Sequence, residues 1–187
     1  MPVTINGTGT IGGLTAGGLP DATVTPADLT QPLTVGTAVA STSGTSIDFT
    51  GIPSWVRRIT VVLNGVSTNG TSISQIQLGT SAGVTTTGYT SHAAAINGGT
   101  GQAAATSGHI STNGAIATMV ISGNFVFTNI SGNSWVGSGV ALYTAASGAM
   151  AISASTIGLA SVLDRVRITT VNGTDTFDAG TINILYE

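Results

Sequence analysis

The chain has 187 residues, enough for one hydrophobic core with an appended segment. Only 6% of the residues are charged, the formal net charge is −3, and all four basic residues are arginines. A nucleic-acid-binding domain needs a basic surface that displaces counterions, so this composition excludes one. Cysteine is absent, which excludes disulfides and thiolate metal sites.

The sequence also bears on where the chain resides. Its opening, MPVTINGTGTIGG, has neither the basic nor the apolar region of a secretion signal. The longest apolar runs, such as Ile59–Leu63, are far too short to cross a bilayer, so we expect a soluble protein with no membrane insertion. The solubility of a monomer usually depends on its net charge. The low charge therefore predicts that a large surface is buried in an oligomer or a rigid assembly.

Residues 1–33 differ from the rest because glycine and proline recur along them. Glycine is costly to order and proline interrupts hydrogen-bonded ladders, so this segment predicts an extended N-terminal arm. One helical turn is expected at Pro26–Leu29, because proline suits the first helical position. The G-x-G-x-x-G match at Gly7–Gly12 is not followed by a possible helix, so we expect no bound nucleotide.

From residue 34 onward, β-branched residues alternate with small polar residues, a pattern typical of half-buried strands. Pairs such as Asn64-Gly65 and Asn172-Gly173 are expected to form turns between them. The expected strands are Thr34–Ala40, Ser46–Phe49, Arg57–Leu63, Ser72–Leu78, Ala115–Phe127, Trp135–Tyr143, Ala149–Ser155, Asp164–Val171 and Thr181–Tyr186. Strands at this spacing predict an all-β domain over residues 34–187, an antiparallel β-sandwich of jelly-roll type.

The period of two along a strand predicts which residues face the core. In Arg57–Leu63, residues Ile59, Val61 and Leu63 share one face. The segment Tyr89–Gly108 is rich in alanine but interrupted by glycines, and we expect a long loop there. Loops of that length tend to be functional or interfacial.

No catalytic constellation stands out, and we expect a non-enzymatic protein without a cofactor or a metal. A glycosidase needs two converging carboxylates. Asp175 and Asp178 are the nearest approach to such a pair, but Asp in a solvated turn commonly caps backbone groups.

A few other side chains are candidates for contact with a receptor or a glycan, namely Tyr89, His92, His109 and Trp135. Tyr89 is the strongest candidate for an exposed aromatic ring, since it starts the expected loop. The two histidines lack nearby acids or a His-x-His pair, so polar loop residues are a better explanation than metal ligands.

The arginines are candidates for pairing between strands or between subunits. Arg165 and Arg167 are two residues apart on an expected strand and therefore share a face. The pairing set is Arg57, Arg58, Arg165, Arg167, Asp48 and Asp164. Recognition of a ligand by these arginines is the alternative. Two of these arginines lie in Leu163–Glu187, where two strand-like runs flank the Asn172-Gly173 pair. This pattern predicts a closing hairpin.

Several segments resemble parts of tailed-bacteriophage virion proteins that are often called tail fibre proteins. Val39–Ser72 (VASTSGTSIDFTGIPSWVRRITVVLNGVSTNGTS) resembles a segment that recurs in them, and Leu163–Glu187 (LDRVRITTVNGTDTFDAGTINILYE) resembles their C-terminal end. Leu19–Leu33 (LPDATVTPADLTQPL) is similar to the linker that precedes such modules. Between Leu78 and Gly158 we find little resemblance, as expected of a variable, receptor-facing region.

The resemblance implies a virion structural protein of tail-fibre type, located in the virion and assembled as a homotrimer. The N-terminal arm is then expected to attach to other virion proteins, and exposed loops to contact a host cell-surface glycan or protein. Several weak sites on a rigid trimer gain effective concentration, so such a protein acts by avidity. The alternative is a capsid decoration (cement) or head-fibre protein that stabilises the shell, and a polysaccharide-degrading enzyme is a remote alternative.

Overall fold

The structure is a computed structural model that describes residues 31–96, 101–144 and 148–187. Residues 33–187 form one compact unit. Of the expected arm over residues 1–33, only residues 31–33 are described, and the helical turn at Pro26–Leu29 and the Gly7–Gly12 motif lie outside the described residues. Every regular element of the described residues is a β-strand, so the all-β class is confirmed. No helix in this part of the chain is long and apolar enough to span a membrane.

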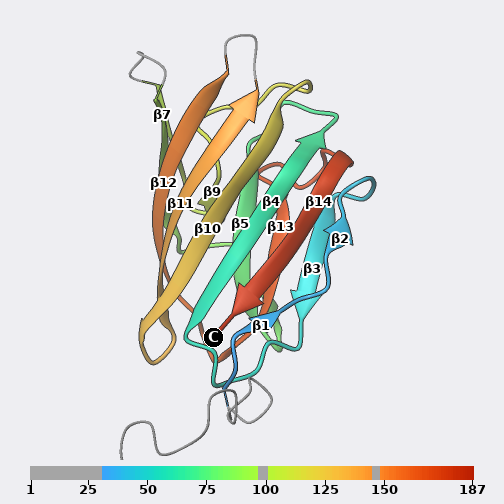
Figure 1. Cartoon of the computed structure of the whole chain (residues 1–187). Coiled ribbons are helices and arrows are strands. Elements are labelled where there is room, and N and C mark those ends of the chain that lie inside the picture. The colour runs from blue at the N-terminus through green and yellow to red at the C-terminus, as the bar shows by residue number, and fades with distance from the viewer. Residues whose placement is uncertain (1–30, 97–100, 145–147) are drawn as a thin grey trace, which may run out of the picture. The chain divides into compact units, whose positions relative to one another are not determined.

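Two antiparallel sheets account for the strands of the described residues. The larger sheet contains, in spatial order, β1 (Thr34–Val35), β14 (Phe177–Tyr186), β4 (Arg58–Thr68), β10 (Val120–Ser131), β11 (Ser134–Thr144), β12 (Ala149–Gly158), β7 (Thr90–Ile96) and β8 (Gln102–Ala105), while β2 (Val39–Ala40) also pairs with β14. The smaller sheet contains β3 (Ser46–Thr50), β13 (Leu163–Thr170), β5 (Ser74–Thr80) and β6 (Gly83–Val84), with β9 (His109–Ile110) also paired with β5. The sheets pack against each other, which confirms the predicted β-sandwich (Figure 1).

The chain passes repeatedly from one sheet to the other. The connections β3–β4, β4–β5, β12–β13 and β13–β14 all change sheets, whereas β10, β11 and β12 form a meander within the larger sheet. The two C-terminal strands therefore do not form the expected closing hairpin. Instead, β13 pairs with β3 and β5, and β14 pairs with β4. The C-terminal strands join early strands in both layers, so the sandwich depends on contacts that are distant in sequence.

The core lies between the two sheets and follows the predicted alternation. Ile59, Val61 and Leu63 of β4 are buried, as their shared face predicts. The largest fully buried side chains are Tyr89, Phe125, Phe127, Phe177, Ile59, Ile76, Leu78, Ile110, Ile168 and Ile182. Their burial supplies the main stabilising term, since each large apolar side chain contributes about 1.5–3 kcal/mol when it leaves water.

The prediction of a long loop over Tyr89–Gly108 is wrong. This segment contains β7 and β8, which extend the larger sheet beyond β12. Alanine is a weak strand former, which obscured the pattern. The alternation is nevertheless present in β7, where Ser91, Ala93 and Ala95 are buried and small enough to fit against the core.

The expected turn at Asn64-Gly65 is also wrong, because β4 continues through it to Thr68. Gly65 adopts a φ of 67° at an irregularity in the pairing with β10 and β14. A tight hairpin turn of type I′ and a G1-type β-bulge both place a glycine at positive φ, so an Asn-Gly pair does not distinguish them. Opposite this bulge lies Gly180, where a Cβ atom would come within 2.5 Å of the Gly65 carbonyl.

Two glycines of β11 make room for the aromatic core. A Cβ atom at Gly137 would lie 2.7 Å from the Phe127 ring, and one at Gly139 would overlap the Phe125 ring and lie 2.9 Å from the Ser153 hydroxyl oxygen. We expect Gly139→Ala to lower the free energy of unfolding by about 1–3 kcal/mol, the usual cost of an overpacked core. Chemical denaturation measures this change. Gly158→Ala is the matched control, because no atom lies within 4 Å of its Cβ position, and an equal loss in both variants would contradict the packing explanation.

Candidate interaction surfaces

Two of the aromatic candidates for receptor contact are core residues. Tyr89 is only 2% exposed, so the expectation that it is solvent-exposed is wrong. Its hydroxyl accepts a hydrogen bond from the Leu78 backbone nitrogen at 2.6 Å, and burial raises its pKa. Trp135 is also buried, and its indole nitrogen has no hydrogen-bond partner in the described residues. Both rings are inaccessible to a receptor and instead stabilise the sandwich.

His109 is likewise a core residue rather than a contact residue. Its imidazole is fully buried between the sheets, with Nδ1 2.7 Å from the Ser155 hydroxyl oxygen and Nε2 2.8 Å from that of Ser153. The rings of Phe125 and Phe127 meet it edge to face at centroid distances of 5.7 and 5.2 Å. Burial lowers its pKa to about 4, because a charged imidazolium is poorly solvated there. His109 is therefore a neutral core residue.

His92 is the one sequence-predicted contact residue of the four that is exposed. It lies on β7 opposite Ala154 of β12, on the face of the larger sheet that points away from the core. His92 and His109 thus lie on opposite sides of this sheet and cannot share a ligand within one chain. The described residues contain no group of three or more His, Cys, Asp or Glu side chains placed to hold a metal.

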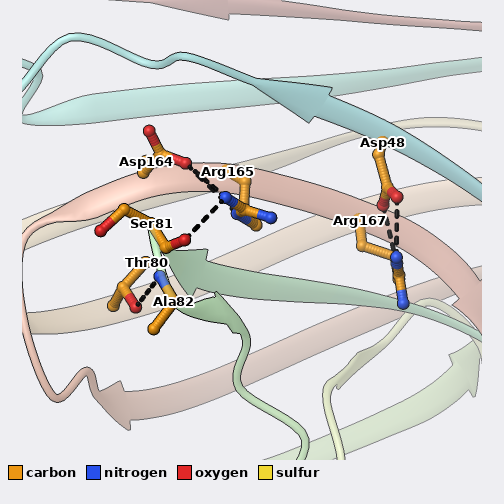
Figure 2. A network of polar contacts seen from close by, with 7 residues as sticks. All are labelled: Asp48, Thr80, Ser81, Ala82, Asp164, Arg165 and Arg167. Carbon is orange, nitrogen blue, oxygen red and sulfur yellow. Dashed lines mark hydrogen bonds and ion pairs between the residues drawn. The ribbon is translucent and has the colours of Figure 1, made fainter.

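The sandwich brings Arg167 and Asp48 together across neighbouring strands. Arg167 Nε and Nη2 donate to the two carboxylate oxygens of Asp48, each at 2.7 Å (Figure 2). This bidentate geometry holds the guanidinium in one orientation. The hydrogen bonds and charge of Asp48 raise the pKa of Arg167. The predicted pairing of these two residues is thus present within one chain.

Arg165 pairs with its own neighbour in sequence. It donates to Asp164 Oδ1 from Nη2 at 2.9 Å and to the Ser81 carbonyl at 3.2 Å (Figure 2). Adjacent residues of a regular strand point to opposite faces, but the pairing of β13 with β5 is irregular between Leu163 and Arg165. The two side chains meet at this irregularity.

The other two arginines lie near the C-terminus of the described chain. Arg58 Nη1 donates to Glu187 Oε1 at 3.1 Å across an exposed pair, whose contribution to stability is small. Arg57 does not bind a carboxylate in the described residues; its Nη1 donates to the carbonyls of Ser54 and Val56. Of the six predicted pairing residues, Arg57 alone forms no ion pair in the described residues and instead donates hydrogen bonds to backbone carbonyls of the loop before β4.

The acidic turn after β13 stabilises the fold locally. Asp175 accepts hydrogen bonds from the Ser72 backbone nitrogen at 2.8 Å and from the Asn172 side chain at 2.6 Å. These hydrogen bonds, of which the one from Asn172 has the larger effect, lower the pKa of Asp175 and favour the ionised carboxylate. Asp178 accepts from the Ser67 hydroxyl instead. Each acid thus has its own hydrogen-bond partner, as a structural turn requires.

The outer face of the larger sheet is nearly free of charge. Five strands (β10, β11, β12, β7 and β8) have no Asp, Glu, Lys or Arg in the described residues. The strands beside them carry only Arg58 and Asp178, close to opposite ends of the sheet. Among the described residues, the centre of this face carries no Asp, Glu, Lys or Arg.

Large apolar side chains occupy the same outer face. Val140 and Leu142 of β11 lie opposite Ile152 and Met150 of β12, and Met150 lies opposite Ile96 of β7. These five side chains are each about half exposed and form one patch, which we call the apolar patch. Beside it, a shallow groove of about 250 Å³ is lined by His92, Ala94, Gln102, Ile152 and Ala154. Contiguous apolar surface of this kind makes the face a candidate interaction surface.

The outer face of the smaller sheet has the opposite character. It carries Asp48, Asp164, Arg165 and Arg167, and a groove of about 290 Å³ follows β13 and β5. Hydroxyl, amide and guanidinium groups dominate its lining, among them Ser46, Gln75, Gln77, Thr86, Ser107 and Arg167, and we call it the polar groove. The two faces therefore present different chemistry to their surroundings.

Sequence reasoning did not single out the apolar patch or the glutamines of the polar groove. A signal for the glutamines was present, because Ser-Ile-Ser-Gln-Ile-Gln-Leu alternates polar and apolar residues over 72–78. The patch had no comparable signal. In β12 the outward residues Met150 and Ile152 are larger than the inward Ala151 and Ser153.

Comparison with protein-family models, with curated proteins and with solved structures gives no match to the chain in any of the three searches.

Proposed function

We propose that the chain is a structural protein of a bacteriophage virion, of tail-fibre type, with no enzymatic activity. In this proposal it assembles as a homotrimer through the outer face of the larger sheet. Residues 1–33 attach it to other virion proteins, and the opposite side contacts a host-surface glycan or protein. The observation that carries the proposal is the segregation of charge, which is concentrated on the smaller sheet and absent from the centre of the larger one.

A second copy is the occupant that best suits the larger sheet. A partner with a charged surface would lose solvation on this face without finding an opposite charge, whereas another copy presents the same uncharged face. The six long strands of this sheet have 7 to 12 residues each. They span roughly 25 by 30 Å, comparable with the about 800 Å² that a standard interface buries on each partner. The face is therefore large enough for stable self-association.

The apolar patch supplies the stabilisation for this contact. Covering a half-exposed Leu, Ile, Val or Met recovers roughly 1 kcal/mol, and the patch has five such side chains. Hydroxyl side chains, among them Ser138 and Thr156, surround it on neighbouring positions and can hydrogen-bond across an interface. In this proposal the sandwich forms the trimer through its larger sheet and leaves the opposite side free to bind the host surface.

Locating the chain in an intact particle tests this function. We expect a cryo-EM map of purified virions, searched with the residue 33–187 sandwich, to show this domain at the tail. Trimeric density with the larger sheets facing the threefold axis is the specific expectation. Density confined to the capsid faces would establish the decoration alternative, and particles that lack the chain altogether would refute the virion proposal.

A further inference from the structure

Two polar atoms in the polar groove are left without an internal partner. Arg167 Nη1 takes part in no hydrogen bond within the described residues, although Nε and Nη2 are both bound to Asp48. Gln77 donates from Nε2 to the Ser107 carbonyl at 2.8 Å, and this bond leaves its Oε1 free. Among the described residues, the only side-chain nitrogen or oxygen that is both fully buried and unpartnered is Trp135 Nε1. Gln77 Oε1 is unpartnered as well, so it must be in contact with solvent.

These groups are held in fixed positions. Gln77 is 4% exposed, and the bond to Ser107 determines which side of its amide faces the groove. Gln75 lies beside it with both ends of its amide bound, since Oε1 accepts from the Ser107 hydroxyl and Nε2 donates to the Thr170 carbonyl. The bidentate pair with Asp48 holds Arg167. A site whose polar groups are already ordered loses little entropy when a ligand binds.

The strand register sets the order of these groups. Asp48 of β3 lies opposite Arg167 of β13, which lies opposite Gln77 of β5. Acceptor, donor and acceptor thus alternate along one row of the sheet, with neighbours about 5 Å apart. The next row, Ser46, Thr169 and Gln75, adds hydroxyl and amide groups.

This alternation selects the chemistry of the ligand. A hydroxyl group both donates and accepts, so a polyhydroxylated ligand can satisfy every position of the row. A phosphate or carboxylate only accepts, and it would face Gln77 Oε1 without a proton to offer, with the negative charge of Asp48 on the neighbouring strand. A bound peptide strand needs pockets for its side chains, whereas the one large apolar residue in the groove lining is Val171.

We propose that the polar groove is a binding site for a neutral saccharide, with Arg167 Nη1 and Gln77 Oε1 as its main contacts. The volume of about 290 Å³ is near the lower limit for small-molecule sites and suits one or two sugar rings. No aromatic side chain lines the groove for stacking, so each site binds weakly and an assembly gains by avidity. The inference depends on the proposed function in one respect only, namely that the saccharide belongs to a host-surface glycan.

The test uses the full-length assembled protein, fluorescently labelled, on an array of bacterial surface polysaccharides and neutral oligosaccharides. We expect retention on a subset of saccharide spots, reduced about tenfold or more by Arg167→Gln, because a hydrogen bond to a charged group is lost. Thr86→Trp, an exposed substitution that fills the groove, has the same expected effect. Arg165→Gln is the matched control, since Arg165 lies on the same strand and face but does not line the groove, and it retains binding.

Three results would overturn the inference. One is no saccharide binding by the wild-type chain, and another is binding that survives both groove variants. The third is retention on peptide or polyphosphate spots of the same array that depends on Arg167, which would assign the groove to another ligand class. Mass and particle location are measured on the same preparations. A trimeric, tail-located protein without saccharide binding refutes the groove alone, whereas saccharide binding by a monomer that is absent from virions refutes the virion function alone.

Discussion

Ile152→Glu is expected to convert the assembled protein into a monomer. Ile152 lies in the apolar patch with Val140 and Ala94 as its cross-strand neighbours, and its side chain is 48% exposed within one chain. In a self-associated face, the substituted carboxylate would be buried beside apolar groups and near its symmetry copies. An unpaired buried charge costs several kcal/mol, more than the roughly 1 kcal/mol each that neighbouring apolar contacts contribute.

Sedimentation equilibrium or light scattering measures this change. The wild-type chain is expected at about three times its mass of 18.4 kDa, and the variant at that mass itself. Val162→Glu is the matched control, because Val162 is equally exposed at 50% but lies outside the larger sheet. A monomeric wild type, or a variant that keeps the wild-type mass, would refute the interface. Circular dichroism on both variants checks that the sandwich remains folded.

Acidification is expected to destabilise the protein well above the range in which carboxylates titrate. His109 has a pKa lowered to about 4 in the folded chain, against 6.5 for a histidine exposed to water in the unfolded chain. Between these values the unfolded chain binds a proton that the folded chain does not, so the free energy of unfolding falls as the pH falls. The full difference is about 3 kcal/mol below pH 4, and about 2 kcal/mol is lost between pH 7 and pH 4.5.

Urea denaturation at pH 7 and pH 4.5, at one protein concentration, measures this effect. His109→Gln is the comparison variant, because an amide can still hydrogen-bond to Ser153 or Ser155 but does not titrate. We expect the variant to be less stable at pH 7 and to lose about 2 kcal/mol less on acidification. An equal loss in both proteins would show that His109 is not the titrating group. The lowered pKa of Asp175 affects the free energy of unfolding only below about pH 4. Its stabilising contribution is present above the pKa that this carboxyl has in the unfolded chain, and it is lost as the pH falls below that pKa.

Most of the strands could be predicted because their residues alternate visibly. In β4 the inward Ile59, Val61 and Leu63 are large and the intervening residues include Arg58 and Thr60, so the buried face is evident from the sequence. In β7 the inward residues are Ser and Ala, and the pattern gives no comparable contrast. The bulge at Gly65 was also beyond local reasoning, because an Asn-Gly pair suits a turn equally well.

The candidate contact residues were chosen by residue type, and type alone does not determine exposure. Tyr89 and His109 have polar groups, which suggested contact with solvent or a ligand. The fold buries both and satisfies them with partners far away in the sequence, Leu78 for the tyrosine and Ser153 and Ser155 for the histidine. Burial depends on which strands become neighbours, and the residues around each position do not reveal this.

The all-β class and the shared face of Arg165 and Arg167 follow from the sequence alone, through residue propensities and the strict period of two along a strand. The low charge is a property of the composition itself. In strands without a visible contrast in size and polarity, such as β7 and β12, only the packing of neighbouring strands sets which face points inward. At Ser153 and Ser155 of β12 the interior is already filled by Phe125, Phe127 and His109, so these inward residues are small, while the larger Met150 and Ile152 point outward. Close packing of neighbouring strands therefore produced the apolar patch, and strand register placed Gln77 beside Arg167.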